Sequence, residues 1–369
     1  MAQRDQASNR FIVGCMTGTS IDAIDAACVE IEGHGLAMTA RPCGFASAPL
    51  GALVDELRAL AAQHPMTARQ VASLNRAFSL THINVIRRAA AGKRPDLVAV
   101  HGQTVFHDPP VSWQLINATV IAAEIQAPVV SDLRAADLAL DGQGAPITPL
   151  ADWVLFRDQR ESRAIVNLGG FSNFTYLPAG AAPQDVIGGD ICLCNQLLDY
   201  IARKYLNRPF DDGGAAASAG AVSARVLQQM LGYLGSQSGA RRSLGTRDEC
   251  LDRIEDWGRA ASSGDLARTA CEAIAQTIAA ALPRAQRVLL AGGGAKNAAL
   301  TAAIRNCCGV TCESTERMGV ATEAREAVEI AILGALCDDG VPIALPRITG
   351  ARGAAVAGTW VRGFNRESG

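Results

Sequence analysis

The chain has 369 residues, of which 49% are hydrophobic and 19% are charged, and its formal net charge is −2. Because single hydrophobic cores stop growing near ~250–300 residues, we expect two domains. A nearly neutral chain is not expected to have nucleic acid or an anionic membrane as its main partner. No apolar run approaches the ~18 residues of a membrane-spanning helix, and the polar residues 1–10 lack the apolar segment of a secretion signal.

The eleven cysteines are odd in number and lie mostly within apolar segments, without paired spacing. Together with the missing secretion signal, this predicts reduced, mostly buried thiols in a cytoplasmic protein. Cys192-x-Cys194 and Cys307-Cys308 lack the CxxC spacing of zinc sites, so a metal role remains only as an alternative.

The stretch Phe11–Ile31 predicts a strand, a tight turn and a returning strand. Glycine lets a ligand approach the backbone, and hydroxyl and N–H groups at such a tip can hold phosphate oxygens. An aspartate just beyond could hold Mg²⁺ against those oxygens. The alternative is an ordinary polar turn. The tip contains three hydroxyls, one glycine and two carboxylates: Thr17, Thr19, Ser20, Gly18, Asp22 and Asp25.

The rest of the first half alternates helices and short strands. Apolar periodicity predicts two helices within 50–91, the second capped by Thr67. A buried strand then ends in His101-Gly-Gln-Thr, where open α/β sheets bind ligands, although His101 could equally be a core histidine. A helix over 118–126, a strand from Pro128 and a non-helical loop over 141–146 follow.

The second half repeats the opening pattern, with a strand–turn–strand over 163–177 around Gly169-Gly170. A glycine triplet after a buried strand would let a base and ribose lie against the backbone. No Walker P-loop or GxGxxG fingerprint occurs, so a nucleotide site would have to use the two hairpins. The other expected elements are a glycine break at 188–190, helices over 195–206, 213–234, 266–282 and 325–337, a mobile charged flap over 235–255, strand–GGG–helix over 287–300, a turn at 345–350 and a closing strand over 355–361.

In this order the motifs resemble the ATPase core shared by actin, the Hsp70 chaperones and the sugar kinases. They resemble most closely the anhydro-N-acetylmuramic acid kinases, over nearly the whole chain from Phe11 to Thr359. The resemblance is carried by GCMTGTSID at 14–22, HGQTV at 101–105, DLR at 132–134, GQGAP at 142–146, NLGG at 167–170, GGGAxN at 292–297 and LPxxTGA at 345–351.

The resemblance implies an α/β fold of two RNase H-like lobes flanking an ATP cleft. We expect residues 10–131 plus 345–369 to form the first lobe, which carries the first phosphate hairpin. Residues 132–344 would form the second lobe, with the catalytic aspartate, the second hairpin and the adenosine motif. The family resemblance also suggests a homodimer.

The implied reaction is the ATP-dependent hydrolytic opening and phosphorylation of 1,6-anhydro-N-acetylmuramic acid, in cell-wall recycling. By resemblance, Asp190 is the catalytic base, and Asp22 is the residue proposed to hold Mg²⁺. The sugar would be bound by His101, Gln103, Thr104, Arg134 and Glu326. ATP would be bound by Gly18, Thr19, Ser20, Ile21, Asp22, Ala23, Ile24, Asp25, Asn167, Gly169, Gly170, Asn195, Gly292, Gly293, Gly294 and Asn297.

The chain departs from the family pattern mainly near Asp190. Ile191–Cys194 replaces Thr-Gly-Pro-Gly, Gly189 stands where an aromatic residue is usual, and Ala23 stands for a glycine. The segment 243–247 resembles Ser-Leu-Gly-Arg-Glu with one residue inserted. These changes bear on substrate identity more than on ATP binding. Two alternatives therefore stay open: a kinase for another anhydro-sugar such as levoglucosan, and a nucleotide-binding regulator with a degenerate catalytic loop.

Overall fold

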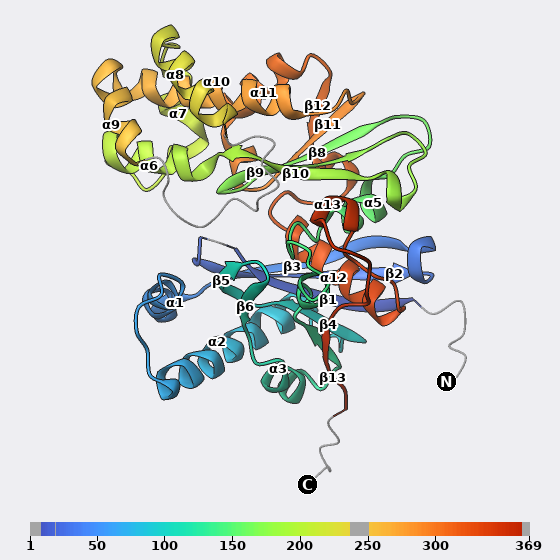
Figure 1. Ribbon diagram of the computed structural model, residues 1–369. Coiled ribbons are helices and arrows are strands. Elements are labelled where there is room, and N and C mark those ends of the chain that lie inside the picture. The colour runs from blue at the N-terminus through green and yellow to red at the C-terminus, as the bar shows by residue number, and fades with distance from the viewer. Residues whose placement is uncertain (1–8, 19, 237–250, 364–369) are drawn as a thin grey trace. The chain divides into compact units, whose positions relative to one another are not determined.

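A computed structural model describes residues 9–18, 20–236 and 251–363 (Figure 1). The chain forms two compact units, Met1–Leu155 with Ala324–Gly369, and Phe156–Glu323. The boundaries expected from the sequence are 131/132 and 344/345, whereas residues 132–155 and 324–344 lie in the first unit. The reason is that α12 (Arg325–Asp338) packs against β1 (Arg10–Thr17).

The first unit is built on a six-stranded sheet in the order β13-β7-β4-β1-β2-β3. The strands β1, β2 and β3 form an antiparallel meander. The strand β4 runs parallel to β1, and β7 runs parallel to β4. The remaining strands of this sheet are β2 (Ala23–Glu32), β3 (Thr39–Pro49), β4 (Leu97–His101), β7 (Val129–Ser131) and β13 (Thr359–Val361).

Helices cover both faces of this sheet. The α2 helix packs on one face through Leu74 and Phe78, in a cluster that includes Val13. Because neighbouring residues of a strand face opposite sides, Gly14 faces α12 on the other. Thr67 caps α2 in a capping box with Gln70, as predicted. The helices of this unit are α1 (Val54–Ala61), α2 (Ala68–Ala89), α3 (Ala118–Ile125), α4 (Ala135–Leu138), α5 (Pro149–Phe156, whose last residue lies in the second unit), α12 and α13 (Pro346–Thr349).

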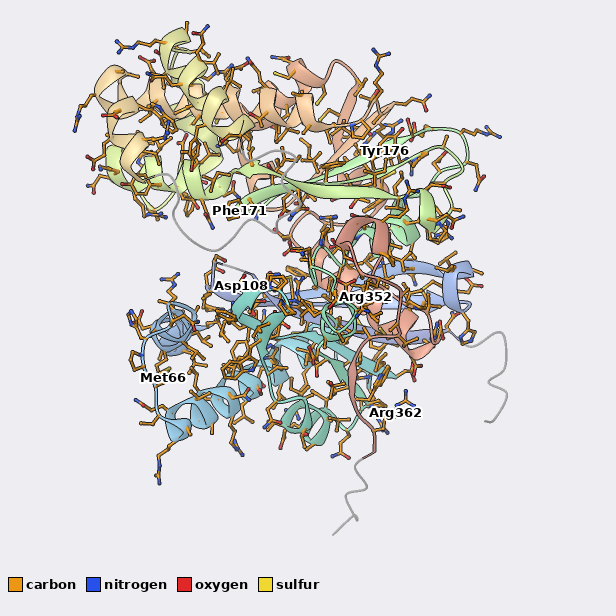
Figure 2. All side chains as sticks on the ribbon, in the orientation of Figure 1. Met66, Asp108, Phe171, Tyr176, Arg352 and Arg362 are labelled. Carbon is orange, nitrogen blue, oxygen red and sulfur yellow. The ribbon has the colours of Figure 1, made fainter. Side chains whose placement is uncertain are left out.

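A separate two-stranded hairpin follows β4, formed by β5 (Gln103–Asp108) and β6 (Val111–Leu115). Asp108 lies near its turn (Figure 2). Phe106 and Trp113 pair directly across the two strands and are partly exposed.

The second unit is built on a five-stranded sheet in the order β10-β9-β8-β11-β12. Its strands are β8 (Arg163–Leu168), β9 (Phe171–Leu177), β10 (Ile187–Leu193), β11 (Arg287–Ala291) and β12 (Thr311–Ser314). The strands β8, β9 and β10 again form an antiparallel meander, and β11 runs parallel to β8. When β13 is left aside and the strands of each sheet are numbered in chain order, both sheets have the order third-second-first-fourth-fifth. This shared order agrees with the predicted two-lobed α/β fold.

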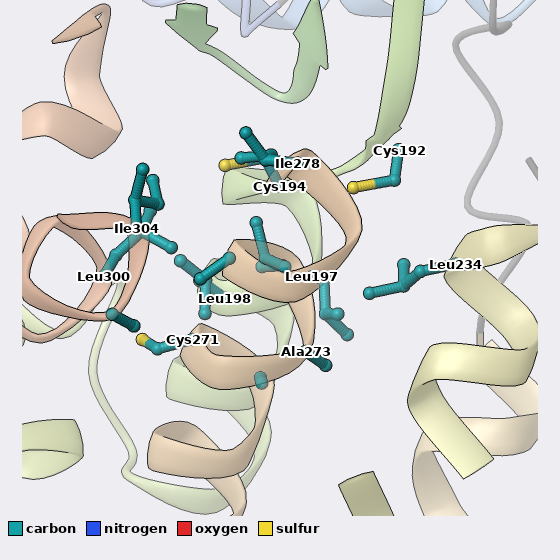
Figure 3. Close-up of a cluster of buried hydrophobic side chains, with 14 of the residues drawn as sticks. Cys192, Cys194, Leu197, Leu198, Leu234, Cys271, Ala273, Ile278, Leu300 and Ile304 are labelled. Carbon is teal, nitrogen blue, oxygen red and sulfur yellow. The ribbon is translucent and has the colours of Figure 1, made fainter. Parts of the chain in front are cut away.

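The helices of the second unit bury a core rich in cysteine and small residues. Cys192 and Cys194 lie in it beside Leu197 and Cys271 (Figure 3). The predicted helix over 213–234 is broken at Gly220, where a Cβ would collide with the Gly264 carbonyl. The helices are α6 (Asn195–Tyr205), α7 (Ala215–Ala219), α8 (Ala224–Gly235), α9 (Leu251–Ala260), α10 (Ser263–Ala281) and α11 (Ala298–Cys308).

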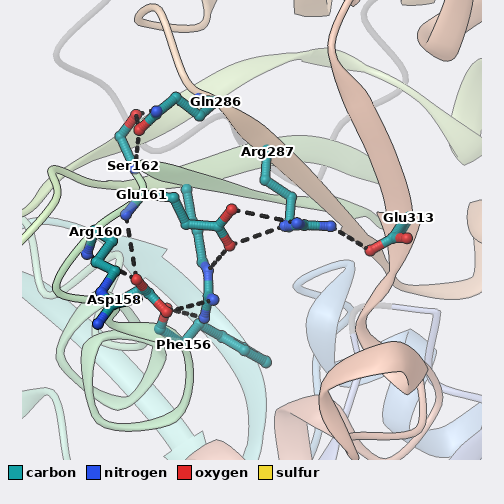
Figure 4. Close-up of polar contacts among 9 residues, drawn as sticks. Phe156, Asp158, Arg160, Glu161, Ser162, Gln286, Arg287 and Glu313 are labelled. Carbon is teal, nitrogen blue, oxygen red and sulfur yellow. Dashed lines mark hydrogen bonds and ion pairs between the residues drawn. The ribbon is translucent and has the colours of Figure 1, made fainter.

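A network of charged groups joins the starts of β8 and β11. Glu161 accepts from Arg163 Nε at 2.8 Å and from Arg287 Nε at 2.9 Å, and Arg287 also pairs with Glu313 (Figure 4). These hydrogen bonds, that from Arg287 above all, lower the pKa of Glu161. The network stabilises this end of the parallel strand pair.

Three further predictions of local structure were wrong. The expected glycine break at 188–190 lies inside β10, because these residues pair with β9. The turn at 345–350 contains the short helix α13, and α9 begins at Leu251, within the expected flap. Residues 237–250 of that flap lie outside the described residues.

The ten cysteines among the described residues are free, and only Cys43 is exposed. Within the same residues no helix is long and apolar enough to cross a membrane.

Candidate active site

The first hairpin tip folds into a tight turn between β1 and β2. Ile21 N donates to Gly18 O at 3.2 Å, and Ile21 has a positive φ of 51°. Ser20 Oγ and Ala23 N both donate to Asp22 Oδ1, at 2.5 and 2.9 Å. The tip therefore holds one carboxylate oxygen in place at an exposed position. Thr19, also predicted to bind ATP, lies outside the described residues.

Neighbouring elements fix this tip from behind. Arg58 of α1 donates to Ser20 O at 3.0 Å, and Leu50 N donates to Asp22 O at 2.9 Å. Among the described residues, a Cβ at Gly18 would meet only Ser20 Oγ, at 3.6 Å, so these residues leave the backbone there open to an approaching group. The buried Thr17 hydroxyl has no hydrogen-bond partner among the described residues. Ile24 is buried in β2, so its side chain belongs to the core. Asp25 is half-buried in the same strand.

Two of the predicted sugar-binding residues of the first unit lie in direct contact. Arg134 Nε donates to His101 Nε2 at 2.9 Å, and Arg134 Nη1 donates to Gly144 O at 2.5 Å. Burial, and then the charge of Arg134, lower the pKa of His101 to about 3. His101 is therefore a neutral hydrogen-bonding group rather than an acid or base at physiological pH.

The other predicted sugar-binding residues lie on neighbouring elements. Gln103 is buried at the start of β5, where its Oε1 has no partner among the described residues, and Thr104 follows it half-buried. Buried polar atoms of this kind are usually satisfied by water or ligand. Glu326 lies in the first turn of α12.

Sequence reasoning missed Asp137 and Thr349, which support this region. The buried Asp137 carboxylate accepts from Gly144 N and from Thr349 Oγ1, each at 2.7 Å. Asp137 follows the quoted motif at 132–134, and Thr349 is part of the motif at 345–351 without having been assigned a role, but nothing in their sequence neighbourhoods shows that they meet.

A second missed cluster lies at the start of α12. Arg325 Nη2 donates to both oxygens of Asp152 at 2.7 Å, and the same nitrogen lies 2.8 Å from Glu329 Oε1. All three side chains are at least 97% buried. Burial, with Asp152 and Glu326 nearby, raises the pKa of Glu329 although Arg325 lowers it. We attribute a proton to Glu329 at neutral pH, because one buried guanidinium cannot neutralise two carboxylates.

The second unit holds the other half of the predicted ATP-binding residues, and several of them are in contact. Cys194 N and Asn195 N donate to the carbonyls of Gly170 and Gly169, both at 2.9 Å, and Asn195 Nδ2 donates to Leu168 O at 2.9 Å. The second hairpin turn is therefore hydrogen-bonded to the N-terminal turn of α6.

The glycine triplet lies against the same turn. A Cβ at Gly292 would approach Asn167 Oδ1 to 2.6 Å, and one at Gly294 would approach Asn195 Oδ1 to 2.7 Å. Within the part of the chain that the structure describes, a Cβ at Gly293 would meet only Asn195 Nδ2, at 3.6 Å, so these residues leave its backbone accessible.

Asn297 lies at the far end of this motif and caps α11 by accepting from Leu300 N at 3.0 Å. Its amide lies so close to Gly214 that a Cβ there would collide with it. Gly214, at φ 71°, is thus a further residue of the region that sequence reasoning missed. The DGG at 212–214 was its only signal.

Asp190 lies in a polar row that crosses three strands. Its register partner on β9 is Asn173, whose own partner on β8 is Asn167. Directly opposite residues of antiparallel strands project from the same face. The flanking Val166 and Leu168 belong to the helix-covered core, so the polar row lies on the opposite face. Asn173 was not predicted as a site residue.

The unusual segment Ile191–Cys194 lies in the core. All four residues are buried, and a β-bulge separates Asp190 from Cys192. Bulges redirect side chains next to active sites. Burial raises the pKa of Cys192 to about 12 and that of Cys194 as well, so these thiols remain protonated.

Among the described residues, no three His, Cys, Asp or Glu side chains are grouped to hold a metal ion. A magnesium ion bound mainly through substrate phosphates and water would not need such a group. The exposed carboxylate of Asp22 supplies oxygen donors of the type that Mg²⁺ prefers.

Comparison with known proteins gives one consistent result. Residues 10–362 match a family model described as anhydro-N-acetylmuramic acid kinase. Curated proteins of that name are 34% identical in Salinibacter ruber, over 93% of this chain and 94% of theirs, and 34% identical in Bordetella pertussis, over 96% and 97%. A third, from Bacillus thuringiensis, is 30% identical over 94% of this chain and 98% of its own.

Solved structures give distant matches. Component A of (R)-2-hydroxyglutaryl-CoA dehydratase from Acidaminococcus fermentans is 12% identical, with a TM-score of 0.47 over 88% of this chain and 98% of its own. A ROK family glucokinase from Streptomyces griseus is 13% identical, with a TM-score of 0.40 over 88% and 99%.

Proposed function

The chain belongs to the anhydro-N-acetylmuramic acid kinase family, and from that premise we propose how its own residues carry out the reaction. The protein is an ATP-dependent sugar kinase of cell-wall recycling. It converts 1,6-anhydro-N-acetylmuramic acid, ATP and water to N-acetylmuramic acid 6-phosphate and ADP.

The chemistry requires one base and a site for a triphosphate. In the anhydro-sugar, O6 is bonded to C1, so no 6-hydroxyl is available. Water attacks C1 as the C1–O6 bond breaks and a carboxylate accepts the proton of the water. O6 then forms a bond to the γ-phosphorus of ATP, and the bond between that phosphorus and the β-phosphate oxygen breaks. ADP is released. Such a transfer depends mainly on positioning and charge neutralisation.

We assign the base to Asp190. The observation that carries this assignment is the polar row of the second unit, in which Asp190, Asn173 and Asn167 lie on one face and the row reaches the glycine triplet. A general base contributes roughly 10²–10⁴-fold to a rate. Asn173 and Asn167 would orient the carboxylate and the reacting groups beside it.

The nucleotide would be held by the two hairpins and the glycine triplet. Ser20, Asp22 and the backbone at Gly18 would bind phosphate oxygens, and so would Gly169 and Gly170 of the second hairpin. The support is the Ser20–Asp22 hydrogen bond and the open space at Gly18. Gly292, Gly293, Gly294 and Asn297 would bind the adenosine. A bound Mg²⁺ would supply positive charge against the phosphate oxygens, and Asp22 is the residue that would hold it.

The sugar would be held by the first unit. Arg134 would bind the anionic or oxygen-rich part of the substrate, with Gln103, Thr104 and Glu326 as further hydrogen-bonding groups. The support is the unsatisfied buried Gln103 Oε1 and the hydrogen-bonded fixation of Arg134.

A coupled ADP-release assay tests the proposal. The wild-type protein is expected to release ADP with 1,6-anhydro-N-acetylmuramic acid, and much less with levoglucosan or N-acetylmuramic acid. Preference for levoglucosan would show that the protein is a kinase for a different anhydro-sugar. That alternative stays open because the unusual segment Ile191–Cys194, which is buried, lies beside Asp190. ATP binding without turnover on any sugar would establish a regulator. Turnover on N-acetylmuramic acid alone would contradict the ring-opening mechanism.

We also propose that the protein is a cytoplasmic homodimer that requires Mg²⁺. Light scattering after size exclusion would give about twice the mass of the 38.5 kDa chain, and a single-chain mass would contradict the dimer. Turnover that survives EDTA would contradict the magnesium requirement.

A further inference from the structure

The Arg134 guanidinium is held by neutral acceptors on two sides. Its Nε donates to His101 Nε2 at 2.9 Å, and its Nη1 donates to Gly144 O at 2.5 Å. An imidazole nitrogen and a backbone carbonyl fix the direction of the guanidinium plane without neutralising its charge. Arg134 remains a cation, because a guanidinium does not lose its proton in proteins.

The Gly144 acceptor is itself fixed. Gly144 N and Thr349 Oγ1 donate to the two oxygens of the buried Asp137 carboxylate. Gln143 N donates to Thr349 O at 2.9 Å, and Gly142 lies so close to Asp137 that a Cβ would collide with the carboxylate. The loop that presents the Gly144 carbonyl is therefore hydrogen-bonded on both sides, so its oxygen has one position.

His101 completes the arrangement only in one protonation state. Since Nε2 accepts from Arg134, the proton of the neutral ring is on Nδ1. A second proton on Nε2 would remove the acceptor and place two cations 2.9 Å apart. Among the described residues, the titratable or charged groups that act on the ring are Arg134 and His107, and neither favours the imidazolium. Burial of the side chain, 8% exposed, acts in the same direction.

We infer that His101 is a positioning residue: it stays a neutral Nδ1–H imidazole whose Nε2 directs the Arg134 guanidinium toward the anionic group of the sugar, and it transfers no proton in the reaction. The substrate part of this inference rests on the proposed function. The tautomer and the hydrogen bond to Arg134 do not.

Nuclear magnetic resonance of the full-length protein labelled with ¹⁵N-histidine tests the tautomer. The chain has five histidines, and His101→Gln identifies the signal. We expect an unprotonated Nε2, a protonated Nδ1 and no titration between about pH 5 and 8. In Arg134→Met the ring should titrate at a higher pH than in wild type. Titration of wild-type His101 between about pH 5.5 and 7.5, or a proton on Nε2, would overturn the inference.

Two amide substitutions test the positioning role. The side-chain amide oxygen of Gln reaches the position of Nε2, whereas that of Asn reaches only the position of Nδ1. Because a hydrogen bond to a charged group contributes ~1.5–3 kcal/mol, His101→Asn should raise the sugar KM by about tenfold or more. His101→Gln should raise it by clearly less, and the ATP KM should change little in either variant. Equal losses in both, or a loss confined to kcat, would refute positioning.

Failure of the proposed function is distinguishable from failure of this inference. If wild type turns over no sugar, the proposed function fails, and the resonance measurement still decides the state of His101. Equal melting temperatures of both variants and wild type would show that the KM changes do not come from unfolding.

Discussion

Single residues in the second unit show how strand register assembles a polar site. Asp190, Asn173 and Asn167 come from three strands, and only the pairing of β10, β9 and β8 puts them in one row. Val166 and Leu168, which flank Asn167 on β8, are buried in the core. A shift of one residue in the register would turn the carboxylate from the polar face into that core.

The first prediction concerns Asp190 itself. Asp190→Asn keeps the shape of the side chain but removes the proposed base, so kcat should fall by roughly 10²–10⁴-fold while ATP affinity changes little. Steady-state kinetics and isothermal titration with ATP measure the two quantities. Asp256→Asn is a matched control, because that carboxylate is 74% exposed on α9. Loss of ATP binding, or retained turnover, would refute the assignment of the base.

At the scale of elements, the packing of α12 on β1 depends on a missing side chain. A Cβ at Gly14 would collide with Ala327 O and Ala331 N, both in the backbone of α12. The helix therefore lies directly on the strand that leads into the first hairpin. This close contact also explains why residues 324–344 belong to the first unit rather than the second.

Gly14→Ala is expected to destabilise the first unit by about 3 kcal/mol, because a backbone cannot yield as a flexible side chain does. Urea unfolding of the purified protein measures the loss. Gly353→Ala in the same unit is the control, since a Cβ there meets no atom of the described residues within 4 Å. Equal unfolding midpoints for the two variants would contradict the close packing.

The buried cluster of Arg325, Asp152 and Glu329 connects α12 with α5. Because the folded-state pKa of Glu329 is raised, the unfolded chain releases its proton at a lower pH than the folded chain does. The free energy of unfolding therefore falls as the pH rises above ~4.5, by up to ~1.4 kcal/mol per unit until the folded pKa is reached.

Glu329→Gln should remove this dependence. The variant keeps a neutral side chain of the same shape, so its stability relative to wild type should increase steadily from about pH 5 to pH 8. Urea unfolding at several pH values measures the difference. Glu323→Gln, at a carboxylate that is 53% exposed, serves as the control. A difference between Glu329→Gln and wild type that does not change with pH would show that Glu329 is ionised in the folded protein.

At the scale of the whole molecule, the chain passes between the two units at 155/156 and again at 323/324. Relative motion of domains is the default expectation for such an arrangement. Enzymes that must admit one water molecule and otherwise keep water from ATP commonly close over their substrates.

Sugar together with a non-hydrolysable ATP analogue should therefore reduce the radius of gyration in solution. Small-angle X-ray scattering with neither, one or both ligands measures this. The nucleotide alone should give a smaller change than the two together. Identical scattering in all four states would contradict closure.

Local sequence patterns predicted much of the fold and part of the site. The hairpins around Gly18 and Gly169-Gly170 and the glycine triplet were recognisable because tight turns need particular residues at adjacent positions. Thr67 was recognisable as a cap for the same reason. The strand β3 was missed, because its sequence TARPCGFASAP does not alternate between apolar and polar residues, although the exposure of its residues alternates along most of the strand.

The sequence by itself therefore determined the alternation of strands and helices, the two hairpins and, through its motifs, the family. Only the tertiary structure decided that Asp137 meets Thr349, that Asp152 and Glu329 share Arg325, and that Asn173 pairs with Asp190. The first two contacts join residues 212 and 173 positions apart. Such pairs depend on how whole elements pack, and no local pattern of polarity or turn chemistry records which distant partner a buried charge will find.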